Sequence, residues 1–373
     1  MSSVTLTVVT PTHGRPALVG QLLASLSIAV DAFAHEGGTA QVVLVDSSVG
    51  EDASAIAALA AGHGATLVRS HNDVRHKRNV GVALATGELV LFVDSDCKAD
   101  PRLLVEHAAA HRVARAPDGR PVAGVLGLVR LTGARTPAWR AAEAAGFCDS
   151  FDFAARYPQA DWGPCANLSF RREILVAVGG FREQWPRRLG GDDVELGMRI
   201  NAGGHAILCR PEAVVEHSRA TWARWAAVLE RAWRWGAMDL HVRAALPASR
   251  RRPAGAGPEL VLVAGVAAVV AQAVRARRLT ALLRLAPVAG TALLCQWRPR
   301  RPLLDGLAGD ALQLLFACGA TAEAVRRGRP ALAFAGLHPV DRGAAVRRAR
   351  RRSATTAAGL LAVLSLARMD ASR

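Results

Sequence analysis

The chain of 373 residues is 51% hydrophobic and 21% charged, and it is long enough for a catalytic domain of roughly 220 residues with an appendage. Its formal net charge of +16 is divided unevenly, because residues 1–221 carry 22 basic and 23 acidic side chains whereas residues 222–373 carry 25 and 8. Six scattered cysteines without a C-x-x-C pair argue against a zinc ribbon or a redox motif and fit a reduced, cytosolic setting. We predict two domains, 1–221 and 222–373, with an anionic partner for the second unless a genome-driven arginine bias alone explains its charge.

Between residues 4 and 130, short runs rich in β-branched residues alternate with runs rich in alanine and leucine. The predicted strands are 4–10, 41–46, 65–69, 89–94 and 122–130, and the predicted helices are 16–34, 52–62, 74–86 and 101–115. This order predicts a parallel sheet with helices on both faces, and we expect no signal peptide before its first strand. Because ligands bind beyond the carboxyl ends of such strands, the loops 10–15, 46–50 and 94–98 should converge on one crevice.

The predicted second domain contains four apolar stretches separated by arginine clusters. The stretches are 260–274, 279–296, 303–325 and 354–367. Their lengths do not clearly exceed the roughly 20 residues that span a bilayer, so we interpret them as interfacial rather than securely transmembrane. Tryptophans and arginines at helical spacing after residue 221 are also typical of a membrane interface: Trp222, Trp225, Trp233 and Trp235 with Arg224, Arg231 and Arg234. The alternative is a soluble α-helical subdomain whose arginines form a solvated face.

Two carboxylates one residue apart, Asp94 and Asp96, follow the apolar strand predicted at 89–94. Hard divalent ions bind carboxylate oxygens together with the phosphates of a nucleotide, so the pair is a candidate Mg²⁺ or Mn²⁺ site. Alone, the D-x-D pattern is weak, because a turn or the N-cap of the following helix would use the same residues.

Six blocks of the sequence, taken in order, resemble the family-2 glycosyltransferases and give the D-x-D pair its context. They lie at 8–15, 43–48, 75–96, 165–183, 190–199 and 211–217. The resemblance implies the α/β GT-A fold, a Rossmann-like nucleotide-diphospho-sugar transferase domain, followed here by an α-helical C-terminal region. It also implies inverting, hexosyltransferase-type transfer from a nucleoside-diphosphate sugar to a hydroxyl of a glycan or lipid-linked glycan.

The same resemblance implies roles for individual residues. The donor-binding residues are expected to be Thr10, Pro11, His13, Arg15, Asp46, Lys77, Arg78, Asp94 and Ser95. Asp96 and His217 would hold a divalent cation, Mn²⁺ or Mg²⁺, with Asp94 nearer the ribose or reaching the metal through water. Asp193 is the expected catalytic base, and its neighbour Asp192 would orient the acceptor.

Each assignment has a structural alternative. Arg78 would be a surface charge, His217 a satisfied structural histidine, and the two acids at 192–193 helix caps. His13-Gly14 and Ser47 depart from the family's usual residues, which leaves the base and sugar preference open.

Two other functions stay open, a sugar-nucleotide nucleotidyltransferase and a membrane-associated scaffold with an inactive transferase domain. The first normally carries a glycine-rich loop with a lysine, of which Gly14-Arg15 is a poor version. The second is disfavoured because the acids and His217 are intact. We expect no nucleic-acid partner. We expect a cytoplasmic protein, peripheral to or embedded in the cytoplasmic face of the cell membrane, that acts in cell-envelope glycan biosynthesis.

Overall fold

The computed structural model describes residues 4–186, 189–245, 251–253 and 302–337. Two compact units divide the chain. The first, here called the sheet unit, comprises Met1–Ala134 and Cys148–Thr221, and the second, the helical unit, comprises Arg135–Phe147 and Trp222–Arg373. The segment 135–147 was not predicted to leave the first domain, because charge and composition do not indicate which distant segment a short helix packs against.

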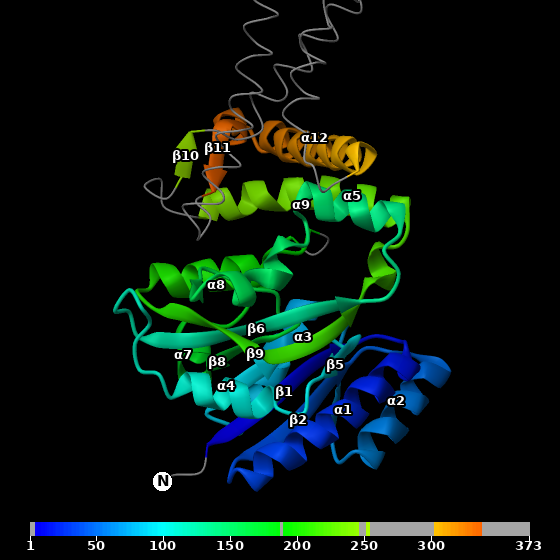
Figure 1. The fold of residues 1–373 in the computed structure, drawn as a ribbon, viewed down its shortest axis with the longest axis vertical. Helices are drawn as coiled ribbons and strands as arrows, with labels where there is room; N and C mark the ends of the chain where they lie inside the picture. Colours follow the sequence, from blue (N-terminus) through cyan, green and yellow to red (C-terminus); the bar gives the residue numbers. More distant parts are fainter. Residues whose placement is uncertain (1–3, 187–188, 246–250, 254–301, 338–373) are drawn as a thin grey trace, which may run out of the picture. The chain divides into compact units, whose positions relative to one another are not determined.

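The sheet unit is built on one mixed sheet (Figure 1). Its strands are β1 (Thr5–Thr12), β2 (Thr39–Asp46), β3 (Thr66–Arg69), β4 (Leu89–Phe92), β5 (Cys97–Ala99), β6 (Val122–Thr132), β7 (Gln159–Ala160), β8 (Leu168–Arg171) and β9 (Ala206–Ser218). The order along the sheet is β3-β2-β1-β4-β8-β6-β9-β5, and β7 pairs with β9.

The five predicted strands, β1, β2, β3, β4 and β6, run parallel to one another as expected, but three strands outside the prediction make the sheet mixed. Strand β8 lies between β4 and β6 and runs antiparallel to both, and β5 and β7 run antiparallel to β9. Strands β5 and β7 have only three and two residues, and β8 lacks the continuous apolar run by which β4, equally short, could be located.

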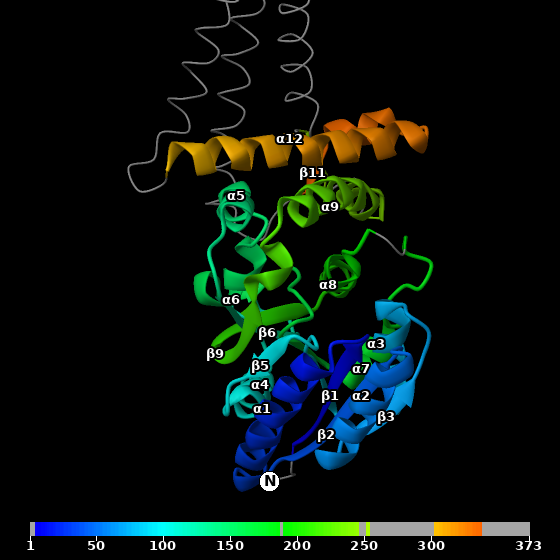
Figure 2. The same ribbon diagram turned by 90° about the vertical axis from the view of Figure 1, so that its right-hand side faces the viewer.

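Helices cover both faces of the sheet. One face carries α1 (Pro16–His35), α2 (Gly50–Gly62) and α4 (Leu103–His111), and the other carries α3 (Val74–Leu84), α7 (Arg172–Ala177) and α8 (Asp192–Ala202). Figure 2 shows α1 and α4 on one side of β1 and β2, with α3 and α7 on the other.

Successive side chains of a strand point to opposite faces of the sheet, which explains these two apolar layers. In β1, Val8 packs with α1 while Val9 packs with α3, and in β4 Leu91 and Phe92 divide in the same way. Strands buried on both faces read as continuous apolar runs, which is why they could be located from the sequence.

Helix α1 is the one described helix long and apolar enough to cross a membrane, with a mean hydropathy of 1.7. Its residues Leu22, Leu26 and Phe33 are buried in the core against the sheet. Its apolar composition is therefore that of a core helix of the sheet unit.

Within the residues that the structure describes, the helical unit contains three α-helices, α5 (Pro137–Ala145), α9 (Trp225–Ala245) and α12 (Leu303–Arg326). Glycines allow close approach: a Cβ built on Gly236 of α9 would lie 1.8 Å from the carbonyl oxygen of Phe316, and one on Gly319 of α12 would lie 2.2 Å from that of Trp233. The predicted apolar stretch 303–325 is α12, whereas 260–274, 279–296 and 354–367 lie outside the described residues.

Short elements complete the described chain. They are η1 (Asp149–Asp152), α6 (Phe153–Arg156), η2 (Arg219–Trp222), β10 (Arg251–Pro253), η5 (Pro330–Phe334) and β11 (Ala335–Leu337). Strands β10 and β11 form a separate antiparallel pair.

Candidate active site

Three loops meet at the carboxyl ends of β1, β2 and β4. The backbone N–H of Gly14, after β1, donates to Oγ of Ser48, after β2, at 2.7 Å. Arg15 reaches the loop after β4, where its guanidinium lies 3.1 Å from Oδ2 of Asp96 and 3.3 Å from Oγ of Ser95. The three loops that the sequence indicated therefore lie together at the strand ends.

Arg15 has an unusual backbone. It is the N-cap of α1 and has a φ of 59°, in the left-handed region, directly after Gly14 at 63°. This pair of left-handed residues turns the chain from β1 into α1, where Pro16 fits the first helical turn. The turn presents the Arg15 side chain at the strand ends, where half of it is exposed.

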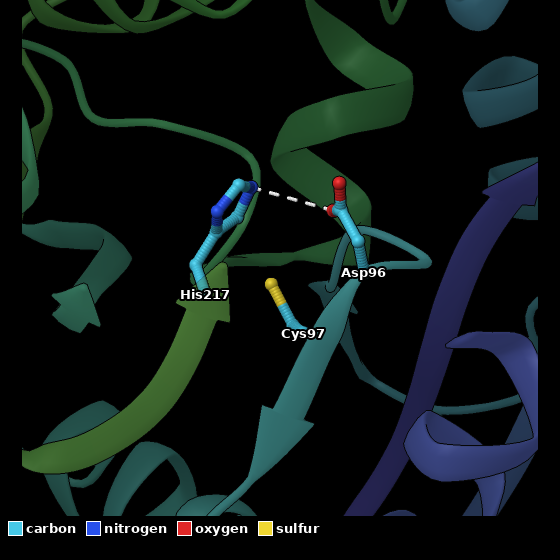
Figure 3. Close-up of side chains that lie close together, drawn as sticks. All are labelled: Asp96, Cys97 and His217. Atoms are coloured by element: carbon cyan, nitrogen blue, oxygen red, sulfur yellow. Dashed lines mark ion pairs between the residues drawn. The ribbon is translucent and has the colours of Figure 1, made fainter. Parts of the chain in front are cut away.

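Asp96 and His217 come from distant parts of the sequence but lie together (Figure 3). Strand β5 pairs antiparallel with β9 so that Cys97 is opposite His217, which places Asp96, just before β5, beside the imidazole. The distance between Nε2 of His217 and Oδ1 of Asp96 is 3.3 Å. The imidazole also stacks on Phe151, with 5.9 Å between ring centroids.

The second nitrogen of His217 fixes how the ring can act. Nδ1 lies 2.9 Å from the carbonyl oxygen of Ser218, which can only accept, so Nδ1 carries the proton. Nε2 is then directed at the carboxylate of Asp96, and either a proton on Nε2 or a cation between the two groups would satisfy both. A backbone carbonyl on the far nitrogen is the usual support for a metal-binding histidine, so these residues fit a divalent cation.

The thiol of Cys97 completes a three-residue cluster, in which potential ligand atoms of Asp96, Cys97 and His217 lie within 4.8 Å of one another. Burial, with the nearby charges of Asp94 and Asp96, raises the pKa of this thiol well above its usual value. A neutral thiol is a weak ligand for hard cations, so the carboxylate and the imidazole are the better donors.

Arg78 of α3 joins the D-x-D loop to the start of α8. Its guanidinium forms a very short contact with Asp192, lies 3.3 Å from Oδ1 of Asp94 and packs over the ring of Phe181 at 5.4 Å. Arg78 is thus a buried cation that is already paired with two acids, rather than an exposed charge on the helix surface.

Asp193 differs from its neighbour. Helix α8 begins after two left-handed glycines, Gly190 and Gly191, and Gly191 takes the N-cap position, so neither acid is the N-cap. Whereas Asp192 pairs with Arg78, the carboxylate of Asp193 accepts a hydrogen bond only from the N–H of Val194 among the described contacts. Burial and the adjacent Asp192 raise the pKa of Asp193 to about 7.

Asp46 lies farther along the same edge and is fully buried. Its Oδ1 accepts from Oγ1 of Thr12 at 2.8 Å and from both N–H and Oγ of Ser48, at 3.0 Å and 2.6 Å, while Oδ2 pairs with Arg69. Burial alone would raise the pKa of Asp46, but these hydrogen bonds and the Arg69 charge lower it overall. The carboxylate is therefore ionised and holds the two loops together.

The other expected donor-binding residues have varied surroundings. Lys77 donates from Nζ to the carbonyl of Thr12 at 2.7 Å, and burial lowers its pKa to about 8 although Asp46 and Asp73 oppose the shift. Thr10 is buried within β1, Pro11 is half-buried, and His13 is exposed.

Four side chains near these residues were not among the predicted site residues: Ser48, Arg69, Cys97 and Phe151. Arg69 and Cys97 owe their positions to strand register, since Arg69 is paired with Asp46 across β3 and β2, and Cys97 with His217 across β5 and β9. Nothing in their local sequence indicates these partners. Ser48 had a signal, because a serine two residues after an aspartate often hydrogen-bonds back to it.

The mixed sheet with loops gathered at the ends of its parallel strands, the acidic pair after β4 and the histidine at the end of β9 define a protein of the GT-A class. The glycosyltransferase-like family 2 model matches residues 4–237, and the chain belongs to that family. It is a glycosyltransferase.

Three known proteins are similar to it. O-antigen biosynthesis protein RfbC of Myxococcus xanthus is 28% identical over 169 residues, which are 39% of this chain but only 12% of that protein. The mannosyltransferase PcManGT from Pyrobaculum calidifontis, solved in complex with GDP-Man and Mn²⁺, has a TM-score of 0.55 at 20% identity and covers 88% of this chain and 89% of its own. S. aureus TarS has a TM-score of 0.42 at 15% identity, over 66% of this chain and 50% of its own.

Proposed function

We propose that the chain transfers a hexose from a nucleoside-diphosphate sugar to an acceptor hydroxyl, with inversion at the anomeric carbon. The observation that supports this most is the convergence of Asp96 Oδ1 and His217 Nε2, 3.3 Å apart, beside Arg15 at the carboxyl ends of parallel strands. A carboxylate, an imidazole and an arginine fork at one edge suit a cation and a diphosphate bound together.

Asp96 and His217 would hold the divalent cation, with Asp94 on the ribose side. When bound, such a cation stabilises the charge that develops on the departing diphosphate. Arg15 is half-exposed, so its guanidinium can exchange part of its contact with Asp96 for a phosphate oxygen. The complex of PcManGT with GDP-Man and Mn²⁺ favours manganese as the first ion to test.

Asp193 would accept the proton of the acceptor hydroxyl. A base works best when its pKa lies near the working pH, and Asp193 has a pKa of about 7. Asp192 is held by Arg78, so it is better placed to position the acceptor than to move a proton.

The test is donor binding and donor hydrolysis across a panel of nucleoside-diphosphate sugars, with Mn²⁺, with Mg²⁺ and with a chelator. We expect one donor to be hydrolysed in a metal-dependent way, and Asp96→Ala to lose this activity. No binding of any donor would favour the inactive scaffold, whereas pyrophosphate release from a nucleoside triphosphate would favour the nucleotidyltransferase.

The helical unit is proposed to bind an anionic membrane surface on the cytoplasmic side. Trp225, Leu229 and Trp233 recur every fourth residue of α9 and are 44–45% exposed, while Val228 and Ala232 are buried. An exposed stripe of tryptophan and leucine flanked by arginines suits the headgroup layer of a bilayer. The O-antigen relative is consistent with a lipid-linked acceptor in cell-envelope glycan synthesis.

Liposome flotation tests the membrane proposal. Full-length protein should bind vesicles that contain anionic lipid and should bind less after Trp225→Ser with Trp233→Ser. Equal recovery with neutral and anionic vesicles, or a wholly soluble protein after cell fractionation, would contradict it.

A further inference from the structure

A row of three side chains crosses the ends of three neighbouring strands. Thr12 of β1 is in register with Asp46 of β2, and Asp46 is in register with Arg69 of β3. Paired residues of parallel strands project from the same face, so the hydroxyl, the carboxylate and the guanidinium form one chain of contacts. Thr12 donates to Oδ1 of Asp46, and Arg69 donates to Oδ2.

The carboxylate of Asp46 has little capacity left for a ligand. Oδ1 already accepts three hydrogen bonds, Oδ2 accepts from Arg69, and the side chain has no exposed surface. An N–H of a nucleotide base could reach Asp46 only by displacing Arg69. Displacing the Arg69 guanidinium costs free energy, because it leaves the buried, ionised carboxylate of Asp46 without a counter-ion.

Arg69 presents the opposite situation. Its side chain is 49% exposed, and its two terminal nitrogens are fixed by Asp46 and by the carbonyl oxygen of Ser48. Two of its five N–H groups are used in these contacts, and the remaining three have no hydrogen-bond acceptor within the described ranges. A planar donor fork is thus held rigidly at its inner edge and open at its outer edge.

The row also lies at a suitable distance from the cation-binding end. From β3 to β4 the sheet crosses three strand spacings, which is about 14 Å, a length comparable with a nucleoside diphosphate laid across the strand ends. With the diphosphate near Arg15 and Asp96, the base would lie over the ends of β2 and β3.

We propose that Arg69, positioned by Asp46 and Ser48, reads the base of the donor, and that it selects a base with two adjacent hydrogen-bond acceptors. Guanine offers such a pair in O6 and N7, and cytosine offers one in O2 and N3. Neither uracil nor adenine has two adjacent acceptors on one edge, so an arginine fork cannot make both bonds to them. This inference rests on the proposed function, because it names the donor class for the same site.

Calorimetric binding of GDP, CDP, UDP and ADP to the full-length protein with Mn²⁺ tests the proposal. GDP or CDP should bind at least about 10-fold more tightly than UDP and ADP, the discrimination expected of a bidentate arginine contact. Arg69→Ala should lose that preference, and so should Arg69→Lys, which keeps the charge but not the fork. The comparison of GDP with CDP decides which of the two bases is read.

Two further variants act as controls. Arg102→Ala removes a similarly exposed arginine, paired with Glu36 and Glu106 beyond the far end of α1, and should leave all four affinities unchanged. Asp46→Asn should weaken the preferred nucleotide as Arg69→Ala does, with folding monitored by thermal unfolding.

Several outcomes would overturn the inference alone. A preference for UDP that Asp46→Asn abolishes and Arg69→Ala leaves intact would assign base reading to Asp46. Equal loss of all four nucleotides in Arg69→Ala, restored by Arg69→Lys, would reduce Arg69 to a general positive charge. If no nucleotide binds the wild type, the proposed function fails and the inference falls with it.

Discussion

The two units of the chain each contain a cluster of charges around a buried group, with opposite composition. In the sheet unit one cation, Arg78, is shared by Asp94 and Asp192, and Asp193 beside them has no cation of its own among the described residues. In the helical unit one acid, Glu323, is contacted by His241, Arg326 and Arg327. This difference in charge balance decides which acid can exchange a proton near neutral pH.

The pKa values express this difference. Hydrogen bonds from Arg326, Arg327 and His241 lower the pKa of Glu323 to about 2 although burial opposes them, so it is ionised at every physiological pH. Burial and the excess of acids raise the pKa of Asp193 to about 7, so it can exchange a proton near neutrality. Glu323, which several cations contact, is suited to stabilising the fold, whereas Asp193, which has no cation of its own among the described residues, is suited to catalysis.

Replacing Asp193, the acid without a cation of its own among the described residues, should have the largest effect on the rate. Asp193→Asn should lower the transfer or donor-hydrolysis rate by about 100- to 10,000-fold, because a general base contributes on that scale. Donor affinity should change little, which calorimetry checks.

Stability provides the control for this variant. A carboxyl whose folded pKa is raised from 3.8 to about 7 opposes folding increasingly as the pH rises between those values. Asparagine cannot ionise, so Asp193→Asn should unfold at the same or a higher temperature at pH 8. Near-normal turnover would remove Asp193 from the base role.

Removing the shared cation should act on both stability and pH dependence. Arg78→Met leaves Asp94 and Asp192 without their buried partner and should cost about 3–5 kcal/mol of unfolding free energy at pH 7, measured by urea denaturation. With less positive charge nearby, the pKa of Asp193 should rise further. Arg102→Met removes an arginine whose side chain is 59% exposed and should cost far less unfolding free energy, and an equal cost in both variants would contradict the buried role.

The wild-type rate should depend on pH through Asp193. Only its ionised form can accept a proton, so the rate under saturating donor should fall about 10-fold per pH unit well below pH 7 and level off above it. Donor binding measured over the same range separates this effect from loss of substrate. A rate that stays constant from pH 8 down to pH 5 would exclude a base with this pKa.

The smallest effect is expected in the helical unit. Glu323→Gln should reduce stability at pH 7 by about 1–3 kcal/mol, since three donors lose a charged acceptor. A folded pKa of about 2 against an ordinary 4.5 means that this stabilisation is full above pH 4.5 and disappears as the pH falls towards 2. The gap between wild type and variant should therefore close on acidification, with catalysis unaffected at pH 7.

Local patterns allowed much of the sheet unit to be predicted. Strands β1 to β4 and helices α1 to α4 have continuous apolar runs or helical periodicity, so their positions were found to within a few residues. Strand β8 has four residues and no such pattern, and it makes the sheet mixed.

The site shows the same division. Asp94 and Asp96 were visible as a pattern at a strand end, and Asp193 and His217 through resemblance to a family. Arg69 could not be predicted as a site residue, because its role depends on the strand register that places it beside Asp46, 23 positions earlier. Arg78 was expected to meet a phosphate, but its burial between two carboxylates depends on α8, more than a hundred residues later.

The left-handed backbone of Arg15 bears on any selection for variants of this protein that resist heat. A non-glycine residue in this conformation costs about 1 kcal/mol, which Arg15→Gly would recover, so thermal unfolding of that variant should move upwards. The same change deletes the guanidinium that faces Asp96, and donor affinity should fall. A screen that rewards only survival at high temperature would therefore enrich variants that have lost their substrate.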